Sequence, residues 1–522
     1  IANFIPDTGI WMNTQRPEWN DANNALVGTG VSVVTLCYLH RFLNKAVPLF
    51  SELEQDSVQL SDEVAAFMSD VASVLEAHQG SIGKGPVSDA VRKEVMEALG
   101  TAAERYRQGI YDRGFSASKK SVSLASVVDC LSRARDISAV SIRSNRRQDG
   151  LYHAYNRIAV RDDGVEIKYL YEMLEGQVAV LSSELLEADE SLALLKTLRA
   201  SSLYTARQHS YLLYPNRQLP SFMARNLVPG EFVKSSTLMT KLVAAGNTDL
   251  IEVDGSGQAF FAGKFNNTAS VAAALTSLAE DGFAEDVSTE RAAIETLFSD
   301  LFDCANFTGR SGGMYAYEGL GSIYWHMVSK LLLAVMETVK QAEEAGASAE
   351  VLAGLQAAYY DVREGIGFNK TPDVYGAFPT DPYSHTPGFA GARQPGMTGQ
   401  VKEEMLTRLL ELGVEVADAR VSFKPSVLRQ SEFLGSSATL RYFDTAGVSQ
   451  SVALEAGELG FTYCQVPVVM ALADSPSITL HTADGATESV AGSVLTAEQS
   501  EALFKKTGHY VRLDVRVTQV MD

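Results

Sequence analysis

The feature that most constrains the fold is a change in the spacing of apolar residues near residue 433. Before that point apolar residues recur every three or four positions, which is the spacing of one buried face of an α-helix. After it apolar and polar residues alternate, as in YVRLDVRVTQV, which is the spacing of a β-strand. We therefore predict a helical domain over residues 1–432 and a smaller β-sandwich-like domain over residues 433–522, with one short helix near 497–505.

The helical part contains about ten to twelve expected helices, and polar aromatic segments separate alternate pairs of them. This order fits an (α/α)6 toroid, in which an inner ring of helices is wrapped by an outer ring and loops at one end build a cleft. The expected helices span residues 24–43, 60–77, 87–112, 122–140, 171–198 (two helices, broken near Asp189), 268–280, 288–303, 318–345 and 349–364, another begins at Thr398, and a hairpin is expected over 250–265.

Composition excludes several classes of partner. Lysine and arginine number 44 against 64 aspartates and glutamates, so the net charge of −20 argues against nucleic acid and against an anionic membrane surface. The longest apolar candidate for a membrane span, residues 25–39, is interrupted by glycines and is shorter than the roughly 20 residues a span requires. The four cysteines are far apart, which favours reduced thiols and a cytoplasmic setting; a leader removed before Ile1 would instead allow a periplasmic or secreted protein.

The first candidate site segment is residues 309–335, which opens with glycines and continues as an amphipathic helix. Tyr317 and Glu318 precede the apolar stripe, and Trp325 and His326 follow within two turns. Aromatic faces beside a carboxylate suit a pyranose ring, because its C–H faces stack on aromatics and its hydroxyls bond to acids. The alternative is a buried helix with a polar cap.

Three further segments combine aromatic and polar side chains. Residues 11–24 hold two of the three tryptophans, and residues 365–399 form a long glycine- and proline-rich stretch typical of a binding loop. The alternative for residues 11–24 is a capped loop that packs its tryptophan on the core, and the alternative for residues 365–399 is a glycine-rich segment that only wraps around the protein. The candidate ligand-binding residues are Arg16, Glu18, Trp19 and Asp21 in the first, Asp381, His385, Arg393 and Gln400 in or beside the second, and Tyr152, His153 and Glu175 in residues 146–176.

Motifs for other chemistries are weak. Gly309-Arg310-Ser311-Gly312-Gly313 fits G-x-S-x-G, but the preceding segment reads as a helix rather than the strand that a nucleophile elbow requires. The eight histidines show no metal-ligand spacing, and no nucleotide-binding motif occurs. We therefore expect no metal and no cofactor.

Helix pairs, tryptophans and tyrosines near acids, and a C-terminal β domain together resemble the (α/α)6-toroid carbohydrate-active enzymes, although many of those place the β domain before the toroid. The resemblance implies an enzyme that cleaves glycosidic bonds of an oligo- or polysaccharide, as a hydrolase or a phosphorylase. Such cleavage needs carboxylates in different environments. We expect Glu318 as general acid, with Asp21 or Glu18 as its partner.

Two alternatives stay open. A polysaccharide lyase would use tyrosine and histidine as base and acid, from either Tyr383, His385 and Arg393 or Tyr152, His153 and Asn156. A non-catalytic glycan-binding protein would need no carboxylate pair. The sugar, the linkage and the oligomeric state do not follow from the residues.

Overall fold

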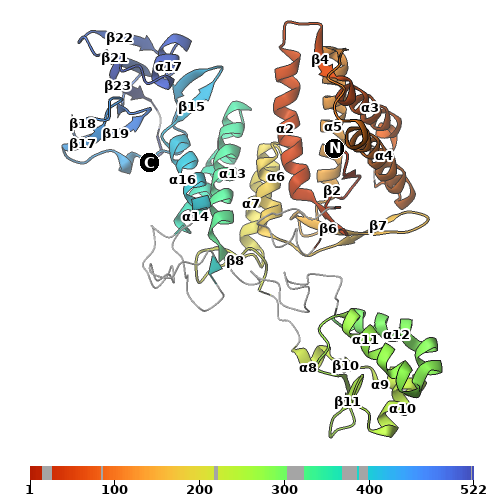
Figure 1. Cartoon of the computed structure of the whole chain (residues 1–522). Coiled ribbons are helices and arrows are strands. Elements are labelled where there is room, and N and C mark those ends of the chain that lie inside the picture. The colour runs from red at the N-terminus through yellow and green to blue at the C-terminus, as the bar shows by residue number, and fades with distance from the viewer. Residues whose placement is uncertain are drawn as a thin grey trace.

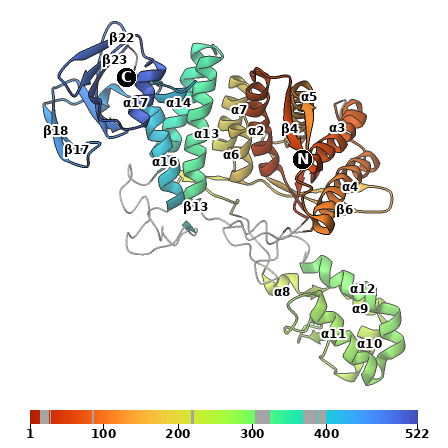
Figure 2. The ribbon, with the colours of Figure 1, turned by 45° about the horizontal axis from the view of Figure 1, so that its top comes forward.

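The structure is a computed structural model, and it describes residues 1–13, 26, 28–83, 86–216, 221–302, 323–366, 385–386, 398–518 and 520–521. Within these residues, buried apolar side chains form three large clusters: one in the helical part, one within residues 228–302 and one in the C-terminal part. Figures 1 and 2 show the three regions from two directions.

The helical part is a two-layered array of helix pairs (Figure 1). One layer holds α2 (Val33–Ser51), α6 (Leu174–Ser182), α13 (Trp325–Glu344) and α16 (Thr398–Glu411), with each helix contacting the next. The other side is formed by α5 (Leu124–Ser144), α7 (Ala188–Ala200) and α14 (Ala349–Glu364). α3 (Asp62–Ile82) packs against α5 and also against α4 (Asp89–Arg113). The middle helix α6 is buried along nearly its whole length, because it is enclosed by neighbours.

Many of these helices have a serine at the N-cap position. Ser32, Ser61, Ser88, Ser123 and Ser348 each accept a hydrogen bond from a backbone N–H of the first turn. Such a cap satisfies an N–H group that the helix leaves without a partner. The caps explain why these helices start where they do.

Short sheets accompany the helices. The largest of these has the order β1 (Phe4–Ile5), β2 (Gly9–Trp11), β3 (Gly30–Ser32), β6 (Tyr155–Val160) and β7 (Val165–Tyr169), with all neighbours antiparallel. Two-stranded ribbons are formed by β4 (Ser57–Ser61) with β5 (Lys119–Ser123), β8 (Tyr204–Thr205) with β9 (Ser210–Tyr211), and β13 (Ile323–Tyr324) with β14 (His385–Thr386).

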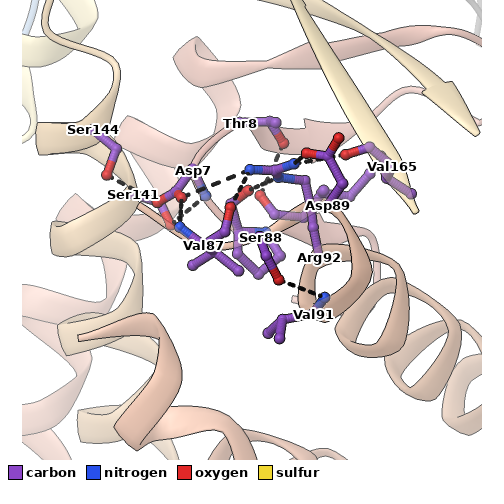
Figure 3. A network of polar contacts seen from close by, with 12 residues as sticks. Asp7, Thr8, Val87, Ser88, Asp89, Val91, Arg92, Ser141, Ser144 and Val165 are labelled. Atoms are coloured by element: carbon purple, nitrogen blue, oxygen red, sulfur yellow. Dashed lines mark hydrogen bonds and ion pairs between the residues drawn. The ribbon is translucent and has the colours of Figure 1, made fainter. Parts of the chain in front are cut away.

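A buried polar network ties β1 to the helices (Figure 3). The Arg92 guanidinium donates to the carbonyl oxygens of Pro6, Val87 and Val165 at 3.2, 2.7 and 2.6 Å. Asp7 accepts from the Val87 N–H at 2.6 Å, and its backbone N–H donates to Ser141 Oγ at 3.1 Å. The network therefore joins β1, α4, α5 and β7.

Residues 221–302 form a unit with its own core and lie apart from the other helices in Figure 1. The helices are α8 (Phe222–Arg225), α9 (Gly230–Ser235), α10 (Thr237–Ala245), α11 (Thr268–Leu278) and α12 (Ala284–Phe302), with a π-helical turn at Ala279–Phe283. The sheet has the order β10 (Leu227–Val228), β12 (Ala259–Phe261) and β11 (Ile251–Val253).

The C-terminal region is rich in strands. A five-stranded sheet has the order β19 (Glu458–Tyr463), β20 (Val466–Leu472), β23 (Tyr510–Val517), β21 (Ser477–Thr482) and β22 (Thr487–Ala491), and β20 and β23 are parallel. Further elements are the hairpins β15 (Val414–Ala417) with β16 (Arg420–Phe423) and β17 (Ala438–Phe443) with β18 (Ser449–Leu454), a 3-10 turn at Gln430–Glu432 and helix α17 (Ala497–Phe504).

The prediction of a mainly helical chain followed by a strand-rich region is confirmed in this coarse form. The closed toroid and the division at residue 432 stay predictions; the core of the C-terminal region includes side chains from Leu412 onward. The expected helix over 24–43 is wrong at its start, because Gly30–Ser32 is a strand and Ser32 caps a helix from Val33 to Ser51. The helix expected from residue 318 begins at Trp325, because Ile323 and Tyr324 pair with β14.

Candidate functional site

The predicted site residues fall in three groups. Glu318, Asp21, Glu18, Arg16, Trp19, Tyr317, Asp381 and Arg393 lie outside the described residues, as do Tyr383 and the G-x-S-x-G segment. His385 and Gln400 are described only by their backbone, in β14 and α16. Tyr152, His153, Glu175, Trp325 and His326 are described with their side chains.

The four helices α2, α6, α13 and α16 run in the same direction (Figures 1 and 2). Arg41 of α2 donates to the Glu337 carboxylate of α13 at 2.6 Å and to Ser182 O, at the end of α6, at 3.0 Å. Near the start of α13, His326 lies 3.5 Å from Glu403 of α16, and near its end Lys340 lies 2.5 Å from Glu415 of β15, the strand that follows α16. The first turns of the four helices therefore lie at one end of the layer, where the N-terminal halves of helix dipoles favour negative charge.

His326 lies in the first turn of α13. Its Nε2 is 3.5 Å from the Glu403 carboxylate of α16, and its Nδ1 is 3.4 Å from the Tyr324 hydroxyl. Burial and the nearby Lys330 ammonium lower the pKa of His326 below its ordinary value, while Glu403 opposes that shift and Lys402 adds to it. The imidazole is thus surrounded by two cations and one carboxylate at the start of two helices.

Glu175 lies in the first turn of α6. The Tyr155 hydroxyl of β6 donates to Glu175 Oε2 at 2.9 Å. Gly176 lets the first turn of α6 approach Ala154 closely, because a Cβ atom at this position would lie 2.9 Å from the backbone nitrogen of Ala154. This close approach brings Glu175 within reach of Tyr155. The neighbouring Tyr38 of α2 exposes 41% of its surface, yet partial burial and the Glu175 carboxylate raise the pKa of its phenol to about 12.

The other predicted residues occupy the core. Trp325 is 1% exposed and packs in the main apolar cluster. Tyr152 is 3% exposed, and His153 is buried with Nδ1 at 2.9 Å from the Leu170 carbonyl oxygen. Side chains this buried contribute packing in this structure rather than a surface for a sugar.

Two residues at this end of the layer were not selected from the sequence. Tyr38 lies inside an apolar helical stretch, and Glu403 lies among charged residues of a helix start, so each resembles an ordinary surface position. Only the packing of α2 and α16 beside α6 and α13 brings them near Glu175 and His326.

Among the residues that the structure describes, no group of three or more His, Cys, Asp or Glu side chains is arranged to hold a metal ion. Helices long and apolar enough to cross a membrane are likewise not found in that part of the chain.

Comparison with known families identifies one segment. Residues 219–305 match the family described as GH149 phosphorylase insertion domain 2, and this segment contains the separate unit of residues 221–302. Comparison with curated proteins gives no match. The match supports a carbohydrate-active enzyme of the glycoside hydrolase and phosphorylase type, and it favours a phosphorylase over a hydrolase.

Proposed function

We propose that the protein is a glycoside phosphorylase, which transfers a glycosyl group from an oligosaccharide to inorganic phosphate. The observation that carries this proposal is the match of residues 219–305 to an insertion domain of a phosphorylase family. The arrangement of the helical layer supports it, and so does the C-terminal strand-rich region. A complete (α/α)6 toroid around the site is part of the proposal.

Phosphorolysis replaces the attacking water of hydrolysis with phosphate. One carboxylic acid must then protonate the leaving oxygen, and the site must hold an anion beside the anomeric carbon. We assign the acid to Glu318, with Asp21 or Glu18 as the partner that holds the substrate. These residues are in the segments that precede α13 and α2 in the chain, and both helices begin at the same end of the layer.

The described residues that suit an anion are His326, Lys330 and Lys402. His326 lies in the first turn of α13, and Lys330 and Lys402 lie in the second turns of α13 and α16. Unpaired backbone N–H groups and the helix dipoles also favour negative charge at these two helix starts. Within this proposal the Gly309–Gly313 segment and Arg393 are further candidates for contacts with phosphate.

The lyase alternative is weakened for one of its two residue sets. Tyr152, His153 and Asn156 are all buried, at 3%, 8% and 0% exposed, so a polymer cannot reach them in this structure. No described residue favours the second set, and the glycan-binding alternative is left to experiment.

The test incubates the protein with neutral and uronate-containing glycans, with and without phosphate, and compares Glu318→Gln, Asp21→Asn and Glu18→Gln variants. Loss of the general acid should lower the phosphorolysis rate by about 10²–10⁴-fold. Glu350→Gln is the matched control, because Glu350 is exposed in the first turn of α14, which begins at the opposite end of the array. New reducing ends without phosphate would indicate a hydrolase, unsaturated products a lyase, and no products a binding protein.

A further inference from the structure

The contact between Tyr155 and Glu175 has the features of a positioning contact. Tyr155 is 2% exposed, so its hydroxyl needs a partner inside the protein, and it donates to Glu175 Oε2 at 2.9 Å. The close approach at Gly176 leaves the first turn of α6 little freedom to move away from Ala154. The carboxylate is therefore held in place at the end of the layer, on a helix rather than on a loop.

Tyr38 brings an accessible aromatic ring to this carboxylate. It lies in the second turn of α2 and is 41% exposed, although most aromatic side chains of the main cluster are buried. Tyr38 lies one turn before Arg41, whose guanidinium donates to Ser182 O at the end of α6 at 3.0 Å, so both side chains lie on the face of α2 that packs on α6. Because α2 and α6 run in the same direction, Tyr38 is displaced from Arg41 towards the start of α6, where Glu175 lies. A phenol that stays protonated can both donate and accept hydrogen bonds.

We infer that Tyr38 and Glu175 form a subsite for an uncharged sugar ring, with Tyr155 as the positioning residue for Glu175. The aromatic face receives the C–H face of the ring, and the carboxylate accepts hydrogen bonds from ring hydroxyls. The negative charge of Glu175 repels a uronate. The inference rests on the proposed function, because it assigns this subsite to the oligosaccharide and His326 with Lys330 to the phosphate.

The competing explanation for the exposed Tyr38 is that it simply lies on a solvent-exposed face of α2. A second exposed aromatic residue on the same helix serves as the control. Phe42 lies one turn after Tyr38 on the same helix and is 63% exposed. A general role of the apolar stripe in packing or solubility would make the two positions equivalent. A sugar subsite makes only Tyr38 important, because Tyr38 is nearer than Phe42 to the start of α6, where Glu175 lies.

The experiment measures initial rates with a panel of neutral pentasaccharides of glucose and mannose that differ in linkage, and with pentasaccharides of glucuronic acid. The variants are Tyr38→Ala, Tyr155→Phe and Glu175→Gln, with Phe42→Ala as the control. We expect Tyr38→Ala and Glu175→Gln to raise the KM for the neutral oligosaccharide about tenfold or more, the effect of losing one good contact. The KM for phosphate should change less than about twofold in the same variants. Tyr155→Phe should raise the oligosaccharide KM without lowering the melting temperature as much as Tyr155→Ala.

Several outcomes would overturn the inference. If the enzyme is active and Tyr38→Ala behaves like Phe42→Ala, the subsite is wrong while the phosphorylase proposal stands. If Tyr38→Ala raises both KM values equally, the residue does not discriminate between the two substrates. If no glycan reacts, the phosphorylase proposal fails, and saturation-transfer NMR with the same panel decides the subsite. Binding of a neutral pentasaccharide that Tyr38→Ala abolishes and Phe42→Ala retains would support it, and no binding to the unaltered protein would exclude it.

Discussion

Replacement of Arg92 by methionine should weaken the first part of the chain strongly. Arg92 is 4% exposed, and its guanidinium donates to the carbonyl oxygens of Pro6, Val87 and Val165. It also lies 3.9 Å from the buried Asp7 carboxylate. Methionine keeps much of the volume but leaves three buried acceptors and one buried carboxylate without this partner (Figure 3).

The magnitude follows from what is left unpaired. A buried polar group without a partner costs about 1–3 kcal/mol, and removal of one partner of a buried ion pair costs about 3–5 kcal/mol. These costs overlap, because local opening would admit water to some carbonyls, so we expect a loss of about 3–5 kcal/mol in local stability. Arg105→Met on the same helix is the control, because Arg105 is exposed and paired with Asp70, and such a pair contributes about 0–1 kcal/mol.

Native-state hydrogen exchange measures this locally, which suits a chain with several separate cores. Backbone amides of β1 and α4 should exchange about a hundredfold or more faster in Arg92→Met, while α17 should be unchanged. A rate increase in Arg92→Met no larger than that in Arg105→Met would refute the reasoning, because it would show that the network is readily replaced by water.

Two further predictions concern the backbone and pH. Gly413→Ala should lower the free energy of unfolding of the C-terminal region by more than about 2 kcal/mol, because the φ of Gly413 is 73° and a Cβ atom there would lie 2.2 Å from the backbone nitrogen of Pro425. Gly447 has a φ of 76° but open space around it, so Gly447→Ala should cost only about 1 kcal/mol. Equal losses for the two variants in urea unfolding would contradict this prediction. Burial lowers the pKa of His153 to about 4, so between about pH 6.5 and 4 the unfolded chain binds more protons than the folded chain. The stability contribution is therefore fully present above pH 6.5 and falls by about 3 kcal/mol towards pH 4. In melting curves, a His153→Gln variant that still folds should lack this part of the acid sensitivity.

Local signals predicted local structure well. The helix expected over 349–364 has the observed bounds, because Ser348 caps its start and Gly365 follows its end. The alternating pattern after residue 433 also gave strands. The starts of α2 and α13 were misplaced because a short strand precedes each helix, and strand pairing with distant residues such as His385 leaves no periodic pattern in so few positions.

The candidate site was harder to predict for the same physical reason. His326 and Glu175 were selected because polar residues at helix starts are visible in the sequence. Tyr38 and Glu403 were not, because their role depends on which helices lie side by side, and spacing along the chain does not encode that. Trp325 and Tyr152 were assigned to ligand binding on residue type alone, whereas packing buries both.

The most direct test of the central claim is ³¹P NMR of the protein incubated with phosphate and the neutral glycan panel. Phosphorolysis predicts that the inorganic phosphate signal falls while an anomeric sugar phosphate signal rises in step with shortening of the glycan. Glycan shortening with no new phosphorus signal, at the same rate with and without phosphate, would contradict the account and identify a hydrolase.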